Sequence, residues 1–155
     1  MAKKSLEPLS LKKIRNVKLG KNVKVSDFTN LYDCEIGDNT FIGPFVEIQK
    51  GAKVGKNCRI QSHVFICSDV VLDDDVFVGH GAMFVNDKYP RSNNPNWKCL
   101  KTRVGKNASI GTNATILPVN IGDWAMIGAG AVVTRNVPNG ETFLGNPARK
   151  YETAR

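Results

Sequence analysis

The sequence has few of the residues that build metal sites, disulfide frameworks or membrane spans. Its 155 residues include only two histidines, His63 and His80, whereas an open catalytic zinc site needs three protein ligands. The four cysteines show no CxxC spacing, which favours reduced thiols over disulfides or a zinc site. No apolar run approaches the ~18 residues of a membrane helix, and residues 1–13 lack the apolar stretch of a secretory signal. We therefore expect a cytoplasmic protein with no metal and no membrane span.

Acidic residues are scarce at the two ends of the chain, so the positive charge is concentrated there. The formal net charge is +8, but the first 24 residues hold eight Lys and Arg against one Glu. Neither an RNA-binding aromatic motif nor zinc-finger spacing is present. The charge therefore predicts small anionic ligands and no nucleic acid. The basic amino-terminal segment is expected either to pair with the acidic residues 73–75 or to cap the start of the folded body.

Large apolar residues recur at every sixth position of this chain. Nine successive positions from Ile36 to Phe84 obey the rule, and further six-residue repeats (hexads) before and after this run bring the set to eighteen. Four residues after each large one, the residue is almost always small or β-branched. A period of six fits neither a helix nor a long alternating strand. It fits a short strand plus a turn, with Gly, Asn and Asp where φ is positive.

This pattern resembles the hexapeptide-repeat left-handed parallel β-helix, in which three strands close a triangular coil. The resemblance covers residues 17–137 and implies an all-β fold of about six coils, in a single domain over residues 1–155. The left hand comes from the family, since ordinary parallel crossovers are right-handed. Residues 87–101 contain no hexad and are expected to form a loop extruded from the coil, and residues 138–155 a short tail. A β-sandwich would not keep a six-residue period over nine units.

The fold alone does not decide the function, and three classes compete. They are a coenzyme A-dependent acyltransferase, a γ-class carbonic anhydrase, and a non-catalytic scaffold or ice-binding prism. Two histidines are too few for the metal site, and no outward threonine ladder marks an ice-binding face. The extruded loop and the ending GNPAR, residues 145–149, favour the first class, because this ending looks like the one that closes many hexapeptide acyltransferases.

The segment VFVGHGAMFVNDKYPR, residues 76–91, narrows the choice further. Together with FVEIQKG and NCRIQSH, it resembles the UDP-2-acetamido-3-amino-2,3-dideoxy-glucuronate N-acetyltransferases of surface-polysaccharide pathways. The resemblance implies acetyl-CoA as co-substrate, a nucleotide-linked amino sugar as acceptor and a homotrimer. Enzymes that acetylate dTDP-linked 3-amino-6-deoxyhexoses share the NDxYPR part and are the alternative. An O-acetyltransferase or a scaffold is a weaker alternative.

Two residues of this segment are the catalytic candidates. The hexad register places His80 and Asn86 at successive turns, both facing outward. A sugar amine with a pKa of about 8 is partly neutral at pH 7, so the enzyme mainly needs to orient it, whereas a hydroxyl would need a strong base. Asn86 is expected to orient the amine, and His80 to contact the sugar or relay a proton. A solvated turn is the alternative for His80, whose flanking glycines are expected to admit the sugar.

The remaining candidates would bind ligands. Arg91 is expected to meet a sugar carboxylate or a phosphate unless it is merely a solvated loop residue, and Asp87 to meet hydroxyls. His63 lies almost one coil from His80 and is the third substrate-binding candidate. The resemblance also implies a coenzyme A groove along the C-terminal coils, between subunits of the trimer. Its expected lining is Gly111, Gly128, Ala131, Pro147, Arg149 and Lys150.

Overall fold

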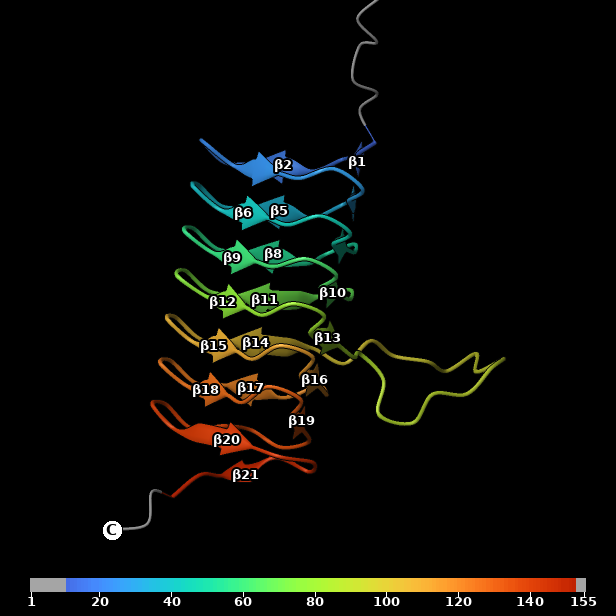
Figure 1. Cartoon of the computed structure of the whole chain (residues 1–155). Coiled ribbons are helices and arrows are strands. Elements are labelled where there is room, and N and C mark those ends of the chain that lie inside the picture. The colour runs from blue at the N-terminus through green and yellow to red at the C-terminus, as the bar shows by residue number, and fades with distance from the viewer. Residues whose placement is uncertain (1–10, 153–155) are drawn as a thin grey trace, which may run out of the picture.

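The computed structural model describes residues 11–152, which form short strands joined by turns. Strands from successive coils align into three parallel sheets that enclose a triangular prism (Figure 1). No helix occurs in this range, so none is present that could cross a membrane. The prediction of an all-β, left-handed parallel β-helix is confirmed.

The three sheets share one order, because the chain visits them in turn as A, B and C. Sheet A contains β1 (Lys13–Arg15), β4 (Asn30–Tyr32), β7 (Glu47–Ile48), β10 (Phe65–Ile66), β13 (Met83–Phe84), β16 (Thr115–Ile116) and β19 (Val132–Val133). Sheet B contains β2 (Lys18–Leu19), β5 (Glu35–Ile36), β8 (Lys53–Val54), β11 (Val70–Leu72), β14 (Thr102–Val104) and β17 (Asn120–Ile121). Sheet C contains β3 (Lys24–Val25), β6 (Phe41–Ile42), β9 (Arg59–Ile60), β12 (Phe77–Val78), β15 (Ser109–Ile110), β18 (Met126–Ile127), β20 (Thr142–Leu144) and β21 (Arg149–Lys150).

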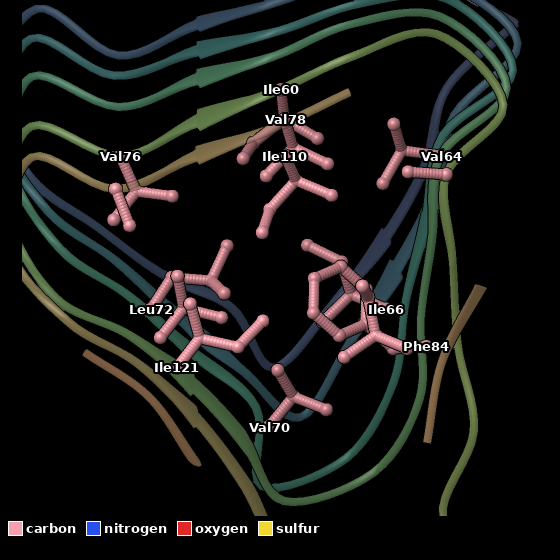
Figure 2. Packing of buried hydrophobic residues seen from close by; sticks show 14 of the residues in the cluster. Ile60, Val64, Ile66, Val70, Leu72, Val76, Val78, Phe84, Ile110 and Ile121 are labelled. Atoms are coloured by element: carbon pink, nitrogen blue, oxygen red, sulfur yellow. The ribbon is translucent and has the colours of Figure 1, made fainter. Parts of the chain in front are cut away.

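The sixth-position residues fill the prism, as the periodicity predicts. Figure 2 shows Ile60, Val78 and Ile110 stacked on one wall and Ile66 with Phe84 on another, all pointing inward. Each of these side chains is at most 1% exposed. Strands pair in register, so that identical positions of successive coils lie over one another at the ~4.8 Å spacing of a sheet. Burial of this continuous apolar column is the main stabilising contribution to the fold.

The turns between sheets B and C form the BC corner. Hydrogen bonds to aspartate side chains join successive coils at this corner. Lysine and aspartate take turns at one position of successive coils, and the carboxylate of each aspartate accepts the backbone N–H of the preceding lysine. The donor–acceptor distances are 2.7 Å for Lys21 N and Asp38, 2.8 Å for Lys56 N and Asp74, and 2.9 Å for Lys106 N and Asp123. The acidic residues therefore fix how each coil lies on the next.

The coil continues beyond its predicted limits at both ends. Sheet A crosses seven coils, against about six predicted, because β1 begins before residue 17. The predicted tail begins with a strand of the prism, since β20 pairs in parallel with β18. β21 then turns back and pairs antiparallel with β20. The hexad rule missed β20 because the spacing changes after Val137.

The described part of the basic segment pairs with acidic residues of the next coil along the chain. Its ion pairs join Lys12 to Asp27, Arg15 to Asp33 and Lys18 to Glu35. The acidic residues at 73 and 75 pair instead with Arg103 and Lys106. Residues 1–10, which hold the rest of the basic segment, lie outside the described range.

Candidate active site at the corner between sheets C and A

His80 lies at the CA corner, the turn between sheets C and A, and its side chain is exposed. Its carbonyl oxygen accepts the backbone N–H of Asn113 at 2.8 Å, one coil further on. On the other side, the N–H of Gly81 donates to the carbonyl of Ser62 at 2.9 Å. The Ser62 hydroxyl lies 2.9 Å from Nδ1 of the His80 ring. The imidazole is therefore held at Nδ1 by the preceding coil, which leaves Nε2 as its other ring nitrogen.

The residue beside His80 in the preceding coil is Ser62, which the sequence did not single out. Sequence spacing put His63 almost one coil away, but this coil has 18 residues, as the register of Phe65 with Met83 shows. In the preceding coil, the position equivalent to His80 is therefore Ser62, and the position equivalent to Gly81 is His63. A count of 18 instead of 17 would have found Ser62 from the sequence.

His63 ends a column of stacked rings on the same corner. The rings of Phe28 and Phe45 lie 5.0 Å apart and nearly parallel, and those of Phe45 and His63 lie 4.8 Å apart. All three residues have φ near +60°, a backbone region that bulky side chains rarely adopt. Ring stacking offsets part of this strain. Phe28 and Phe45 remain about half exposed.

The side chains of the CA corner are of different kinds before and after His80. The aromatic column occupies the coils before it. The same column carries Gly81 in the coil of His80 and Asn113 and Gly130 in the coils after it, where the neighbouring column carries Thr112 and Ala129. The corner thus offers ring surfaces on one side of His80 and a track of small residues on the other.

The glycines of this corner have a structural cause. A Cβ at Gly79 would lie 2.6 Å from the backbone nitrogen of Thr112, and Gly81 has φ of +66°. The backbone of the next coil leaves no room for a side chain at Gly79, and the positive φ makes one strained at Gly81. The two glycines beside His80 are therefore explained by coil packing, without any approach of a sugar.

Asn86 lies at the opposite end of the same face, at the AB corner where sheet A meets sheet B. Strand β13 runs between it and the CA corner, so one chain does not bring Asn86 and His80 together. The carbonyl of Asn86 accepts the N–H of Leu100 at 3.0 Å and so closes the base of the extruded loop. The predicted loop is present and stands away from the prism (Figure 1).

The two other loop candidates make contacts within the loop. One Asp87 carboxylate oxygen accepts the N–H of Tyr89 at 2.8 Å, which stabilises the turn that leads away from the coil. The Arg91 guanidinium donates to the carbonyl of Pro90 at 3.4 Å. Arg91 also lines a shallow hollow of about 620 Å³ together with Trp97.

Two thiols lie at the base of the loop, Cys99 beside the Asn86 side chain and Cys67 near Cys99. Burial raises the pKa of Cys67 to about 12, with the nearby Cys99 adding to the shift. The pKa of Cys99 is also raised, first by burial and then by Asp69, against a smaller lowering by the Asn86 amide. Both thiols are therefore protonated at neutral pH and are poor nucleophiles. Among residues 11–152, no three His, Cys, Asp or Glu side chains gather as a metal site would require.

The predicted coenzyme A residues lie on the C-terminal coils but differ in access. Gly111 and Gly128 belong to the same tightly packed column as Gly79, since a Cβ at either would collide with the next coil. The Ala131 side chain is fully buried, so only its backbone is available to a ligand.

The last three of these residues lie at the end of the prism. Pro147 follows a cis peptide bond and is exposed. Arg149 and Lys150 are exposed on β21. The Lys150 ammonium pairs with Glu141 at 2.7 Å, which raises the pKa of the lysine. The Arg149 guanidinium donates to the carbonyl of Ala148 at 2.9 Å but has no carboxylate partner among the described residues, so it is freer than Lys150 to meet a phosphate.

Two family models match this chain. The bacterial transferase hexapeptide (six repeats) matches residues 33–68, and the hexapeptide repeat of succinyl-transferase matches residues 101–135. The chain therefore contains hexapeptide repeats over these two ranges. Curated relatives include the bifunctional protein GlmU of Aquifex aeolicus, which is 30% identical over 88% of this chain and 28% of its own length. GlmU of a Synechococcus species is 31% identical over 85% of this chain and 28% of its own. This hexapeptide-repeat chain thus spans less than a third of the length of these relatives.

Solved structures share the fold. A mutant of AntD, an N-acyltransferase from Bacillus cereus in complex with dTDP and coenzyme A, has a TM-score of 0.79 at 22% identity over 89% of this chain and 84% of its own. A mutant of perosamine N-acetyltransferase from Caulobacter crescentus, in complex with CoA and GDP-perosamine, has a TM-score of 0.63 at 21% identity over 91% and 58%. The acetyltransferase domain of PglB from Neisseria gonorrhoeae, in complex with acetyl coenzyme A, has a TM-score of 0.63 at 23% identity over 87% and 57%.

Proposed function

We propose that this chain is an acetyl-CoA-dependent N-acetyltransferase for the 3-amino group of a nucleotide-linked amino sugar in surface-polysaccharide biosynthesis. The favoured acceptor is UDP-2-acetamido-3-amino-2,3-dideoxy-glucuronate, and the enzyme would work in the cytoplasm. The observation that carries the proposal is the change of the CA corner at His80. A pantetheine arm fits along the small residues that follow it, and the acceptor fits against the ring side that precedes it.

The relatives support this reaction class. Proteins of similar fold include N-acyltransferases in complexes with coenzyme A and with dTDP or GDP-perosamine. Because AntD was solved with dTDP, a dTDP-linked 3-amino-3,6-dideoxyhexose is the alternative acceptor.

The chemistry is a direct attack in a ternary complex. The neutral amine attacks the thioester carbonyl, the N–C bond forms, and the C–S bond breaks as the electrons return to sulfur. Asn86 would accept a hydrogen bond from the amine and aim its lone pair at the carbonyl, while backbone N–H groups hold the developing oxyanion. The proton leaves through His80 or water and finally protonates the thiolate. The protonated thiols at the base of the loop offer no competing covalent route.

Because Asn86 and His80 lie at different corners of one chain, the proposal requires a second copy of the chain. Both residues would reach one substrate only if the AB corner of one copy faced the CA corner of another. A threefold arrangement about an axis parallel to the prisms repeats such a contact three times and closes it. We therefore infer a homotrimer with three shared sites.

The deciding experiment is a panel of nucleotide 3-amino sugars incubated with acetyl-CoA and purified protein, with thiol release and product mass as readouts. The panel contains UDP- and dTDP-linked acceptors, with and without a 6-carboxylate, and the matching 3-hydroxy sugars. We expect N-acetylation of a 3-amino sugar and no reaction of its 3-hydroxy counterpart. Acetylation of simple galactosides alone would contradict the proposal.

A further inference from the structure

Ser62 and His80 belong to one column of the CA corner, the set of equivalent positions in successive coils. Within residues 11–152, theirs are the only side chains of this column that hydrogen-bond from one coil to the next. The other members of the column are Asp27, Pro44, Thr112 and Ala129, and none of them bonds to the next. The pair differs in this from the Asn ladder of the BC corner, where Asn22, Asn39 and Asn57 bond in series. A general device for holding coils together would recur along the column.

The backbone around this pair is fixed from both directions. The N–H of His63 donates to the carbonyl of Pro44 at 3.1 Å, and the carbonyl of Ser62 accepts from Gly81. The His63 ring stacks on Phe45, and this contact holds His63, the neighbour of Ser62 in the chain, at its positive φ. The Ser62 hydroxyl is therefore presented to Nδ1 from a rigid support.

Ring chemistry decides what this contact does. A serine hydroxyl can accept from Nδ1–H or donate to a bare Nδ1. When imidazole takes up a proton, both nitrogens carry hydrogen, so only the accepting arrangement survives the transfer. That arrangement leaves Nε2 bare in the neutral ring, which is the form a proton acceptor needs.

We propose that Ser62 is a positioning residue: its hydroxyl accepts Nδ1–H of His80 and holds the ring with a bare Nε2 directed at the acceptor amine. This role rests on the proposed function. As the amine attacks, its proton passes to Nε2, and the imidazolium then returns that proton to the coenzyme A thiolate or to water. Ser62 itself neither gains nor loses a proton.

The tautomer is tested on the free protein, without any substrate. Because the chain has two histidines, ring nitrogen spectra of ¹⁵N-labelled protein contain two imidazoles, and the His63→Gln variant assigns them. In the neutral wild-type protein we expect His80 to carry hydrogen on Nδ1. Ser62→Ala should shift it toward the Nε2–H form that predominates in free histidine, and Ser62→Thr should keep the native tautomer. An unchanged His80 spectrum in Ser62→Ala overturns the proposal.

The kinetic test uses Ser109→Ala as the matched control, since Ser109 is a partly buried, outward serine of the adjoining sheet C. We expect Ser62→Ala to lower kcat severalfold with KM values within about twofold of wild type, and Ser62→Thr to restore kcat. The double variant Ser62→Ala/His80→Ala should be no slower than His80→Ala, because Ser62 acts only through the ring. Additive losses would overturn the positioning role.

These results separate the two proposals. A chain that acetylates no amino sugar, but loses the Nδ1–H tautomer in Ser62→Ala, contradicts the proposed function and supports the positioning of His80. A chain that acetylates amino sugars with the same His80 tautomer and kcat in Ser62→Ala supports the function and overturns the positioning.

Discussion

The backbone N–H of Leu100 donates to the carbonyl oxygen of Asn86 at 3.0 Å, so the extruded loop leaves and rejoins the prism at one point. Immediately after the loop, β14 is paired with β11 on one side and β17 on the other. The loop is therefore an addition to a coil that is complete without it.

Replacement of residues 88–98 by a short Gly-Ser link should preserve the prism and impair the chemistry. We expect the melting temperature to change by less than about 5 °C, because no strand pairing is lost. Acetyl transfer should fall at least about tenfold, whereas coenzyme A affinity, measured by calorimetry, should stay near wild type. Full turnover in the shortened chain would remove the loop from the site.

The aspartates of the BC corner should contribute measurably to stability. Asp74→Ala removes the acceptor for the N–H of Lys56, and such a hydrogen bond contributes on the order of 1 kcal/mol. Urea unfolding should show a loss of that size. Asp27→Ala is the control, since among the described residues Asp27 makes only an exposed ion pair at 3.7 Å with Lys12 and should change stability by less than about 0.5 kcal/mol. Equal losses would show that the corner carboxylates do not hold the coils.

The hexad rule predicted the fold because it reads the interior. Inward positions such as Ile36 and Ile110 are at most 2% exposed, and a prism core demands a large apolar residue at each. The corners obey looser rules, because the steric demand there is on the backbone. Phe28 and Trp124 occupy positive-φ positions where Asn or Gly is expected.

The candidate site was harder to predict for the same reason. Outside the coil that carries the loop, coil length varies between 16 and 18 residues, as Leu31 pairs with Ile48, Ile48 with Ile66 and Met126 with Thr142. A single residue of error moves a side chain to the neighbouring column, which is why the 17-residue separation of His63 and His80 did not reveal Ser62 as the residue beside His80. The periodicity correctly placed Asn86 and His80 at successive turns. Six residues is one face of the triangle, so the same spacing also implies their separation.

The protein should lose stability in alkaline solution. Burial raises the pKa of Cys34 and Cys58 to about 11 and that of Cys67 to about 12, above their usual value. A raised acid pKa means that the folded state keeps protons that the unfolded state releases. The contribution is therefore present below about pH 8.5 and is lost as the pH rises toward 11 and 12.

Urea midpoints measured from pH 7 to pH 10.5 should accordingly fall above about pH 8.5. The fall should be smaller in Cys58→Ala, which lacks one of these thiols, even though its stability at pH 7 is lower. A midpoint that stays constant through this range would contradict the burial of the thiols. Labelling by iodoacetamide at pH 8 should be slow and should reach half-buried Cys99 first.

Shared sites predict complementation between inactive chains. Asn86→Ala should lower kcat at least about tenfold, which corresponds to ~1.4 kcal/mol or more, with coenzyme A affinity unchanged. Asn86→Ala chains mixed with His80→Ala chains, dissociated and reassembled, would form some sites with both residues native. Turnover above that of either parent, with light scattering confirming trimers, is the expected result. A monomer of 17.0 kDa, or no gain on mixing, would contradict a site built from two copies.

The last prediction concerns what His80 contributes. If the amine reaches the site largely neutral and Asn86 orients it, His80→Ala should lower kcat less than Asn86→Ala does. The acid limb of kcat/KM should persist in that variant, because it reports protonation of the substrate amine. If His80 were an obligatory base, its removal would abolish turnover, and the acid limb would disappear from any residual activity. We expect the first result, since an amine needs a weaker base than a hydroxyl. Complete loss of activity in a His80→Ala trimer that still binds both ligands would overturn this expectation.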